Sequence, residues 1–369
     1  MIQFIIRRRE HPIPYSHASL ISIFVSILIS LAILTMFGIN PVIAVWEAFI
    51  YPLISGYGWS GVLRNALPLL LCGIGLIIAF RAGVWNIGAE GQMLLGAIVA
   101  TWVALYFMPD KPSIIVIPLM FVLGFIAGGV WGLIAGILKS KWNVNEVLTT
   151  MMLNYVAYQL VYYLVMGPWQ DPVTNYPVTK PFPPNACLPK ISKTFPVPIP
   201  TLIIAIISAL FVYVLLFHSK LGYEIRAIGS NPDAAKAYGI SCEKIVMIAM
   251  FLSGGFAGLA GVNAVAGAIP AQLRRPEQVS RGYGFIAILV AWLAGLHPIA
   301  AILTSILMGI FFIAGSSIEI IFHTGVETTN LFIGSLLLVL SVAETLRHYS
   351  IRVKFTSSLF KIGKKSSGG

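Results

Sequence analysis

The sequence predicts an all-α integral membrane protein, and three observations lead to this fold class. First, apolar runs about as long as a bilayer-spanning helix recur along most of the 369 residues. A spanning helix needs roughly 20 mostly apolar residues, because only a helix or a closed barrel pairs every backbone amide in lipid. Second, hydrophobic residues make up 58% of the chain and charged residues only 10%. Third, the breaks between the runs carry Lys, Arg, Gly or Pro.

Ten apolar segments are candidate membrane elements, so we expect about ten transmembrane segments, some of them broken or re-entrant. They cover residues 20–37, 62–80, 87–107, 114–138, 146–166, 199–217, 245–268, 284–296, 298–318 and 328–346. Segment 284–296 is too short for an ordinary crossing and has Gly282 and Gly284 at its start, which predicts a broken helix. The chain then divides into an N-terminal segment (1–19), one transmembrane domain (20–346) and a basic tail (347–369).

Basic residues predict that both termini are cytoplasmic, because Lys and Arg resist translocation. With the N-terminus inside, arginines 7–9, the basic residues of loop 218–244 and those of the tail 347–369 all fall on the inner side. The outer side receives fewer basic residues. An arrangement with both ends inside needs an even number of crossings, which ten satisfies.

Composition and motifs also exclude several classes of function. Basic residues stand at span ends instead of forming a stripe, so the net charge of +11 does not indicate a nucleic-acid partner. The three cysteines lack metal-site spacing, and we expect no metal and no cofactor. The sequence contains no GxxxxGK[ST] phosphate loop, no HExxH and no GxSxG. We therefore expect that the chain is not an enzyme and that any ATP hydrolysis occurs elsewhere.

Two loops differ in composition and in expected structure. The outer loop 167–198 is rich in Pro, which predicts an ordered cap without a long helix. The inner loop 218–244 contains Asn231 and Pro232 followed by Asp233, Ala234 and Ala235. Asn before Pro is typical of a helix start, so we expect a short cytoplasmic helix there.

Polar residues between two apolar runs are the first candidates for a solute path. Asn86, Glu90 and Gln92 lie among glycines that allow the helix to break and expose backbone groups. An acid at membrane depth is costly unless it lines a wet cavity or has a partner. The alternative is a short cytoplasmic turn in which Glu90 only caps the next helix.

Further candidates lie at the starts of two later segments. Glu146, Thr149 and Asn154 share one helix face, which lines a solute path or hydrogen-bonds a neighbouring helix. Tyr283 and Phe285 carry rings that stack on a planar ligand or anchor the chain at the membrane interface.

Two internal patterns bear on packing. Ser253 and the glycines of residues 254–261 form a small-residue face for close helix contact. Residues 143–155 and 325–335 each place an acid and hydroxyls at the start of a span, on opposite sides of the membrane. An inverted repeat predicts such a pair, and chance similarity of two short stretches is the alternative.

Five ordered motifs together carry a family resemblance: GVWNIGAEGQMLLGA (83–97), VNEVLTTMMLNYVA (144–157), GSNPDAAKAYGI (229–240), SGGFAGLAGV (253–262) and GYGFIAILVAWLAGLHP (282–298). The chain resembles the permease subunits of bacterial ABC importers for simple sugars and nucleosides, most closely the nucleoside branch. Trp85 stands where the nucleoside branch commonly has Phe, which keeps an aromatic ring, whereas Trp292 and Ala294 depart from the usual Ala-Leu-Leu-Gly sequence and leave the details of the substrate open.

The resemblance implies a cobalamin-importer-like (type II) ABC permease fold with an inverted repeat. It implies a second permease subunit, identical or homologous, a cytoplasmic ATP-binding subunit and an extracytoplasmic solute-binding protein. It also places the coupling helix, which the ATPase moves, at Gly229, Asn231, Pro232, Asp233, Ala234, Ala235, Tyr238 and Gly239.

The expected function is therefore import of a nucleoside, either a purine nucleoside or a broad range, through the bacterial cytoplasmic (inner) membrane. Two alternatives remain open. One is an ABC permease for ribose or another simple sugar. The other is an ion-coupled secondary transporter in which Glu90 or Glu146 binds the coupling ion.

Overall fold

The computed structural model describes residues 2–8, 15–36, 38–323, 330–331, 334–335, 338–339, 342–343 and 349–355. The chain forms two compact units, one made of Met1–Ile43 with Asn330–Gly369 and the other of Ala44–Thr329. Helix α2 (Pro41–Val45) lies at the junction of the two units in sequence.

The larger unit is helical and contains the candidate site. Its elements after α2 are the π-helix η1 (Trp46–Ile50), α3 (Tyr51–Ile54), α4 (Gly56–Arg81), α5 (Ala89–Trp102), the π-helix η2 (Val103–Phe107), α6 (Ser113–Trp142), α7 (Glu146–Met166), the 3-10 turn η3 (Pro184–Ala186), α8 (Ile199–His218), α9 (Lys220–Ser230), α10 (Pro232–Ala237), α11 (Cys242–Ala266), α12 (Pro276–Ser280), α13 (Tyr283–Leu293) and α14 (Pro298–Phe322).

Within the described residues, six helical stretches are long and apolar enough to cross a membrane: α4, α5 with η2, α6, α8, α11 and α14. Helix α7 is 21 residues long but is less apolar. The predicted segments up to residue 318 each coincide with a helix, and the short segment at 284–296 is indeed an 11-residue helix, α13. Segment 328–346 and the second half of the proposed repeat, 325–335, lie mostly outside the described residues.

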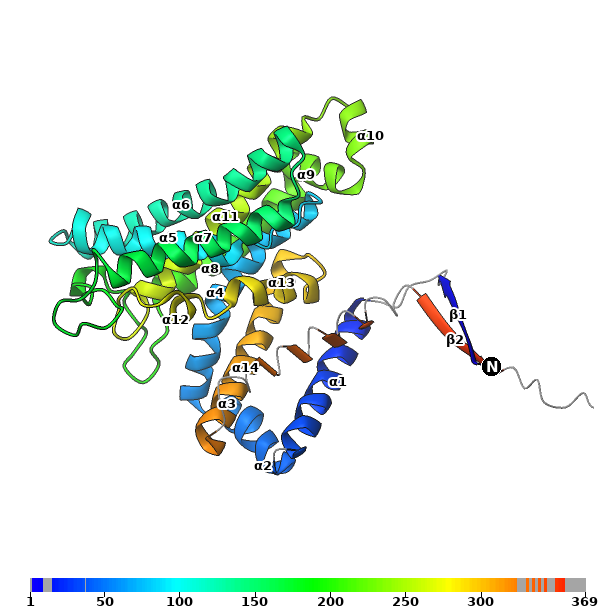
Figure 1. Cartoon of the computed structure of the whole chain (residues 1–369), viewed down its shortest axis with the longest axis horizontal. Coiled ribbons are helices and arrows are strands. Elements are labelled where there is room, and N and C mark those ends of the chain that lie inside the picture. Colours follow the sequence, from blue (N-terminus) through cyan, green and yellow to red (C-terminus); the bar gives the residue numbers. More distant parts are fainter. Residues whose placement is uncertain are drawn as a thin grey trace, which may run out of the picture. The chain divides into compact units, whose positions relative to one another are not determined.

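The centre of the larger unit is built on glycine. Helix α11 packs closely against α5 and α6, which lie beside it in Figure 1. A Cβ added at Gly258 would lie 2.1 Å from the Gly124 oxygen, and one at Gly254 would lie 2.2 Å from the Gly128 oxygen. On the other side, a Cβ at Gly96 would lie 2.2 Å from the Gly258 oxygen. Such contacts require small residues, so the predicted small-residue face of α11 is confirmed.

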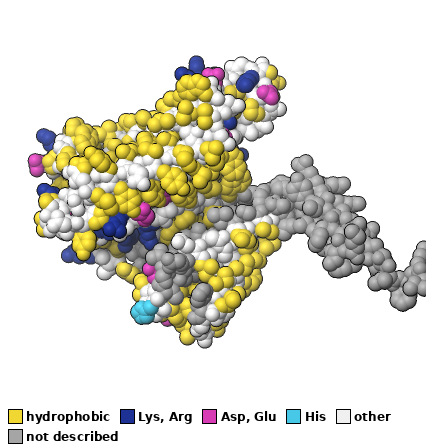
Figure 2. All heavy atoms as spheres, viewed as in Figure 1, with side chains coloured by type: hydrophobic (Ala, Val, Ile, Leu, Met, Phe, Trp, Pro, Cys, Tyr) yellow, Lys and Arg dark blue, Asp and Glu magenta, His cyan; other side chains and the backbone are white. Residues whose placement is uncertain are grey.

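Charged side chains lie mainly at the ends of this helical body. Figure 2 shows hydrophobic side chains over most of the visible face, with charged groups near α10, at the opposite end and over α12. The loop 167–198 and helix α10 lie at opposite ends of the bundle in Figure 1. This distribution fits a body whose middle is surrounded by lipid.

The Pro-rich loop 167–198 has only the short turn η3 and no long helix, as its prolines predict. The backbone amides of Thr179, Phe182 and Leu188 donate to the oxygens of Leu273 (2.9 Å), Ala271 (2.8 Å) and Ala266 (3.1 Å). The loop therefore binds to the chain between α11 and α12.

The smaller unit contains the two strands that the structure describes, which the sequence analysis did not predict. Strand β1 (Ile2–Arg8) pairs antiparallel with β2 (Tyr349–Phe355), with Ile2 opposite Phe355 and Arg8 opposite Tyr349. Helix α1 (Tyr15–Met36) belongs to the same unit. The segment 1–19 and the tail 347–369 are thus joined by a two-stranded ribbon.

Candidate solute-binding site

The segment between α4 and α5 is fixed by paired amide side chains. Asn86 is fully buried, and its Nδ2 donates to Gln92 Oε1 (3.0 Å) and to Ser253 Oγ (2.9 Å). Its Oδ1 accepts from the Gly88 amide (2.8 Å) and from Gln92 Nε2 (3.1 Å). Asn86 and Gln92 therefore hold the turn that starts α5, and contact between these two residues and a solute remains a prediction.

Helix α7 is hydrogen-bonded to the same segment. Asn154 Oδ1 accepts from the Gly91 amide (2.8 Å) and Nδ2 donates to the Ile87 oxygen (2.9 Å). Thr150 Oγ1 accepts from the Ile87 amide (3.2 Å). These bonds fit the alternative in which the polar face of α7 contacts a neighbouring helix. Asn154, on the same face, also lines a hollow together with Phe285 of α13.

The other two predicted residues of α7 have partners near its first turn. Glu146 forms an ion pair with Lys139 of α6 (3.0 Å), and Thr149 Oγ1 donates to the Asn145 oxygen (2.9 Å). The Asn145 side chain caps α7 by accepting from the Val147 and Leu148 amides. Both residues therefore lie at the helix start, away from the deeper part of the face.

Glu90 lies in the first turn of α5, but its carboxylate caps a different helix. Oε1 accepts from the Gly282 amide (3.2 Å) and Oε2 from the Gly284 amide (2.7 Å), both at the start of α13. Oε1 also accepts from the Tyr158 hydroxyl (3.0 Å). Glu90 is fully buried, so in this structure it holds helices together.

A hollow of about 220 Å³ lies beside these bonds and is the best candidate for solute contact. Its lining residues are Met151, Asn154, Tyr155, Tyr158 and Phe285. Asn154 and Phe285 were among the predicted residues. The other three were missed, although positions 151, 154, 155 and 158 share one helical stripe.

The two predicted aromatic residues, Tyr283 and Phe285, lie in different environments. Phe285 lines the hollow and is 40% exposed, whereas Tyr283 is buried and lies outside the lining set. The Tyr283 hydroxyl donates to Asn65 Oδ1 (2.6 Å), and its ring packs against Phe312 at a centroid distance of 5.2 Å. Tyr283 therefore packs α13 against its neighbours, and Phe285 is the exposed ring of the two.

The exposed face of α7 differs in chemistry from that of α8. On α7, Tyr155 and Tyr163 are 64% and 69% exposed, and the other exposed large side chains are Leu148, Met152, Val156, Leu160 and Met166. On α8, the exposed large side chains are aliphatic apart from one ring: Ile199, Ile203, Ile206, Ile207, Leu210, Phe211 and Val214. Aliphatic side chains suit lipid, whereas tyrosine hydroxyls suit a wetter environment. The exposed face of α7 thus differs from that of α8 in its two tyrosine hydroxyls.

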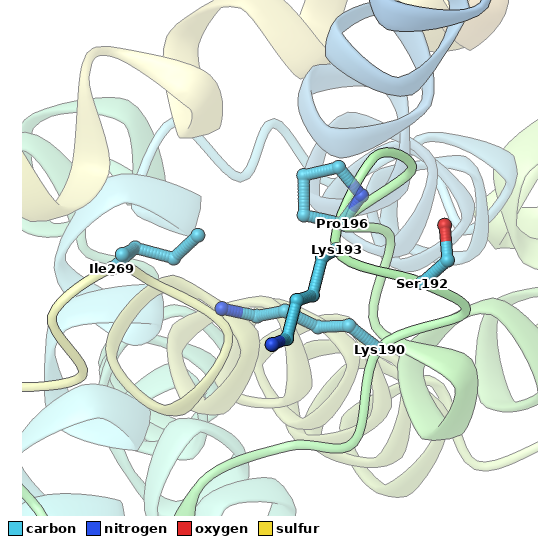
Figure 3. Close-up of a pocket in the computed structure, with 5 residues that line it drawn as sticks. All are labelled: Lys190, Ser192, Lys193, Pro196 and Ile269. Carbon is cyan, nitrogen blue, oxygen red and sulfur yellow. The ribbon is translucent and has the colours of Figure 1, made fainter.

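A second hollow, of about 420 Å³, lies in the outer loop region and was not predicted. Figure 3 shows the side chains of Lys190 and Lys193 extending together into it, with Ser192, Pro196 and Ile269 around them. Lys190 Nζ donates to the Ala268 oxygen (3.4 Å). Burial, and then the like charge of Arg64, lower the pKa of Lys190. Within the described residues, neither lysine forms an ion pair.

The loop 218–244 contains the predicted short helix as α10. The Asn231 side chain caps it by accepting from the Asp233 (3.1 Å) and Ala234 (3.0 Å) amides, and Pro232 takes its first position. Ala235 is buried, whereas Tyr238 is 87% exposed. The Asn-Pro helix start is therefore confirmed.

Glycines determine how this loop is attached. Gly239 ends the α10 turn with a φ of +79°. Gly229, near the end of α9, lies against α4, where a Cβ would be 2.1 Å from the Arg81 oxygen. This contact holds α9 directly on the C-terminal end of α4.

Comparison with known proteins agrees with this architecture. The chain is 33% identical over 331 residues to the glucose ABC transporter permease protein of Haloferax volcanii, covering 87% of this chain and 86% of that protein. It is 33% identical over 321 residues to the guanosine ABC transporter permease protein of Bacillus subtilis (82% and 88% covered). It is also 33% identical over 301 residues to the nucleoside ABC transporter permease protein of Lactococcus lactis (79% and 81%). No solved structure matches.

The family described as the branched-chain amino acid transport system permease component matches residues 58–341. That range includes the segment from α4 to α14, with both hollows and α10. The chain therefore belongs to this family and is a multi-pass membrane permease of the ABC transporter class.

Proposed function

We propose that this chain is one half of the membrane path of an ATP-driven importer that carries nucleosides across the cytoplasmic membrane. The observation that carries the proposal is the hollow between α7 and α13, where the rings of Tyr155, Tyr158 and Phe285 lie near the Asn154 amide. Aromatic rings stack on planar bases, and amide or hydroxyl groups bond to base edges and ribose. The guanosine and nucleoside permeases among the relatives support the same substrate class.

A second permease subunit completes the path in this proposal. The hollow of about 220 Å³ is smaller than the roughly 300–1,000 Å³ typical of small-molecule sites. Its walls include exposed side chains of α7, so a facing half, identical or homologous, would enclose the solute. Contact between the two copies would also cover the exposed tyrosines of α7.

Import of a simple sugar is the second candidate. The glucose permease relative has the same percentage identity and covers slightly more of this chain than the guanosine permease does. A sugar also presents an apolar face that packs on an aromatic ring. The two candidates differ in whether a base is required for uptake.

A separate cytoplasmic ATP-binding subunit supplies the energy by acting on α10. The described geometry suits this role, because Asn231 and Pro232 fix the start of α10 while Tyr238 projects from its end. Helix α9 transmits the movement to α4, on which Gly229 rests.

A line of cation–aromatic contacts continues from α9 toward α13. The Arg226 guanidinium lies 5.2 Å from the Phe217 ring centroid of α8, and that of Arg81 lies 5.8 Å from the same ring. Arg81 Nε donates to the Leu296 oxygen (3.1 Å), between α13 and α14. A push on α10 would thus reach the helix that carries Phe285.

The proposed orientation places both termini in the cytoplasm. The pairing of β1 with β2 supports a common side for the two ends of the chain. The basic residues near α10 and in the termini support the cytoplasmic assignment of that side.

The outer hollow suits docking of the extracytoplasmic solute-binding protein. Lys190 and Lys193 present positive charge there, so we expect acidic side chains on the docking surface of that protein. Replacing both lysines with Glu should lower uptake that depends on the binding protein. A Lys111→Glu variant, on the same outer side but outside the hollow, is the matched control.

Uptake by the reconstituted complex tests the main proposal. Proteoliposomes with both permease halves, the ATPase and the binding protein would receive labelled guanosine, ribose or glucose. Accumulation of guanosine that requires ATP supports the proposal. Accumulation of sugar alone favours the second candidate, and accumulation driven by an ion gradient without ATP refutes the ABC mechanism.

A further inference from the structure

Glu90 is a buried acid whose charge is balanced without a basic side chain. It is fully buried, and within the described residues it forms no ion pair. Instead, its carboxylate accepts three hydrogen bonds, from the Gly282 and Gly284 amides and from the Tyr158 hydroxyl. A buried carboxylate is stable only when such donors surround it.

Helix α13 depends on this carboxylate because it has no cap of its own. Its N-cap residue is Gly282, which has a φ of +74° and no side chain to accept from the first amides. Glu90 supplies the acceptor, and its negative charge suits the positive end of the helix dipole. A Cβ at Gly284 would lie 2.2 Å from the Glu90 nitrogen, so the first turns of α13 and α5 are in direct contact.

Tyr158 brings the opposite wall of the hollow to the same carboxylate. Its ring lines the hollow with Phe285, and its hydroxyl donates to Glu90 Oε1. One turn further along α7, the Tyr162 hydroxyl donates to Glu277 Oε1 of α12 (2.8 Å). Tyr158 and Tyr162 thus hold α7 against the α12–α13 region. Of these two tyrosines, Tyr158 makes its bond beside the hollow.

We propose that Glu90 and Tyr158 are positioning residues for transport that set the width of the hollow. Glu90 holds the first turn of α13, which carries Phe285, and the Tyr158 hydroxyl holds α7 against the same carboxylate. This assignment rests on the proposed function only in treating the hollow as the solute path. The Tyr158–Glu90 bond holds the two walls of the hollow at a fixed separation, so it controls solute affinity.

Transport kinetics of the complete reconstituted complex test the Tyr158 part. Tyr158→Phe keeps the ring and removes the hydroxyl bond to a carboxylate, so the KM for guanosine should rise about tenfold. A rise in KM that is larger than any change in kcat is the result expected of a positioning role, because the ring that lines the hollow is kept. Tyr163→Phe is the control, since Tyr163 lies on the same helix, is 69% exposed and makes no side-chain hydrogen bond within the described residues.

Amide hydrogen exchange of the same complex, which needs no transport, tests the Glu90 part. Glu90→Gln replaces one carboxylate oxygen with an amide donor, so one of the two backbone amides loses its acceptor, and exchange at residues 281–286 should become at least about tenfold faster. Tyr158→Phe should leave that exchange near the wild-type rate. Glu90→Asp, whose shorter side chain reaches only part of the site, gives the same comparison if Glu90→Gln does not assemble.

The outcomes separate this proposal from the proposed function. An unchanged KM in Tyr158→Phe, or wild-type exchange at residues 281–286 in both Glu90 variants, overturns the positioning roles. If the wild-type complex carries no nucleoside, the proposed substrate is wrong, but the exchange measurement still decides whether Glu90 caps α13. In that case the KM comparison is made with the sugar that the complex does carry.

Discussion

Replacing Gly258 with Ala should destabilise the permease through the contacts of α11 with α5 and α6. A Cβ at this position would lie 2.1 Å from the Gly124 oxygen. To restore ordinary contact distances, the helices must separate by about 1 Å. Overpacking of this kind costs about 1–3 kcal/mol, and Ala regains about 1 kcal/mol through its higher helix propensity.

The cost of overpacking is near the upper end of that range because Gly258 contacts two helices. The Gly96 side of α5 also depends on the close approach to the Gly258 backbone. We expect a net loss of about 2 kcal/mol, which corresponds to a fall in Tm of about 4–8 °C for a domain of this size.

Thermal unfolding of the purified complex in detergent, followed by tryptophan fluorescence, measures the effect. Gly56→Ala is the matched control, because Gly56 begins α4 and a Cβ there meets no atom within 4 Å. If Gly258→Ala unfolds at the same temperature as Gly56→Ala, the close contact between helices is not what stabilises this core.

Three further predictions concern α10, the hollow and the outer loop. Asn231→Ala removes the α10 cap, at a cost of about 1 kcal/mol, and should weaken solute stimulation of ATPase activity. Asn231→Asp should preserve that stimulation, and equal loss in both variants would contradict a capping role. Phe285→Ala should raise the KM for guanosine about fivefold through lost stacking, whereas Phe285→Tyr should keep it; equal KM values would exclude stacking at this position. In the outer loop, hydrogen bonds from Thr174, and then from backbone amides, lower the pKa of Asp171. A lowered carboxyl pKa stabilises the fold above the ordinary pKa of Asp and loses this effect as pH falls through the lowered value. Asp171→Asn should therefore increase proteolysis of the loop at pH 7, and the difference from wild type should disappear in acid; a difference that does not depend on pH would argue against the ionised form.

The helices could be predicted because their causes are local. Apolar runs of the required length mark α4, α6, α8, α11 and α14, and the prolines of 167–198 exclude a long helix from the outer loop. The Asn-Pro start of α10 also follows from neighbouring residues, since the Asn231 side chain accepts bonds from amides two and three positions later. The glycines of α11 indicated close packing but did not identify α5 and α6 as the partners.

The site was only partly predictable because its bonds join distant residues. Glu90 precedes the amides that it caps by 192 and 194 positions, and no local pattern indicates such a partner. Tyr158 lies among several tyrosines on α7, and only the fold shows which of them reaches a carboxylate. The helices between Pro41 and Ile54 were missed because they are short and consecutive. The β1–β2 pair was missed because its strands come from the two ends of the chain.

In the proposed solute path, the hydrogen bonds of Asn154 limit how this permease can acquire a new cargo. Both polar atoms of the Asn154 amide are bonded to backbone groups near α5, so most substitutions there would disturb folding before they altered selectivity. Met151, Tyr155 and Phe285 line the same hollow without any such described bonds. Among related permeases that carry different solutes, we therefore expect the residues at these three positions to differ and Asn154 to be retained.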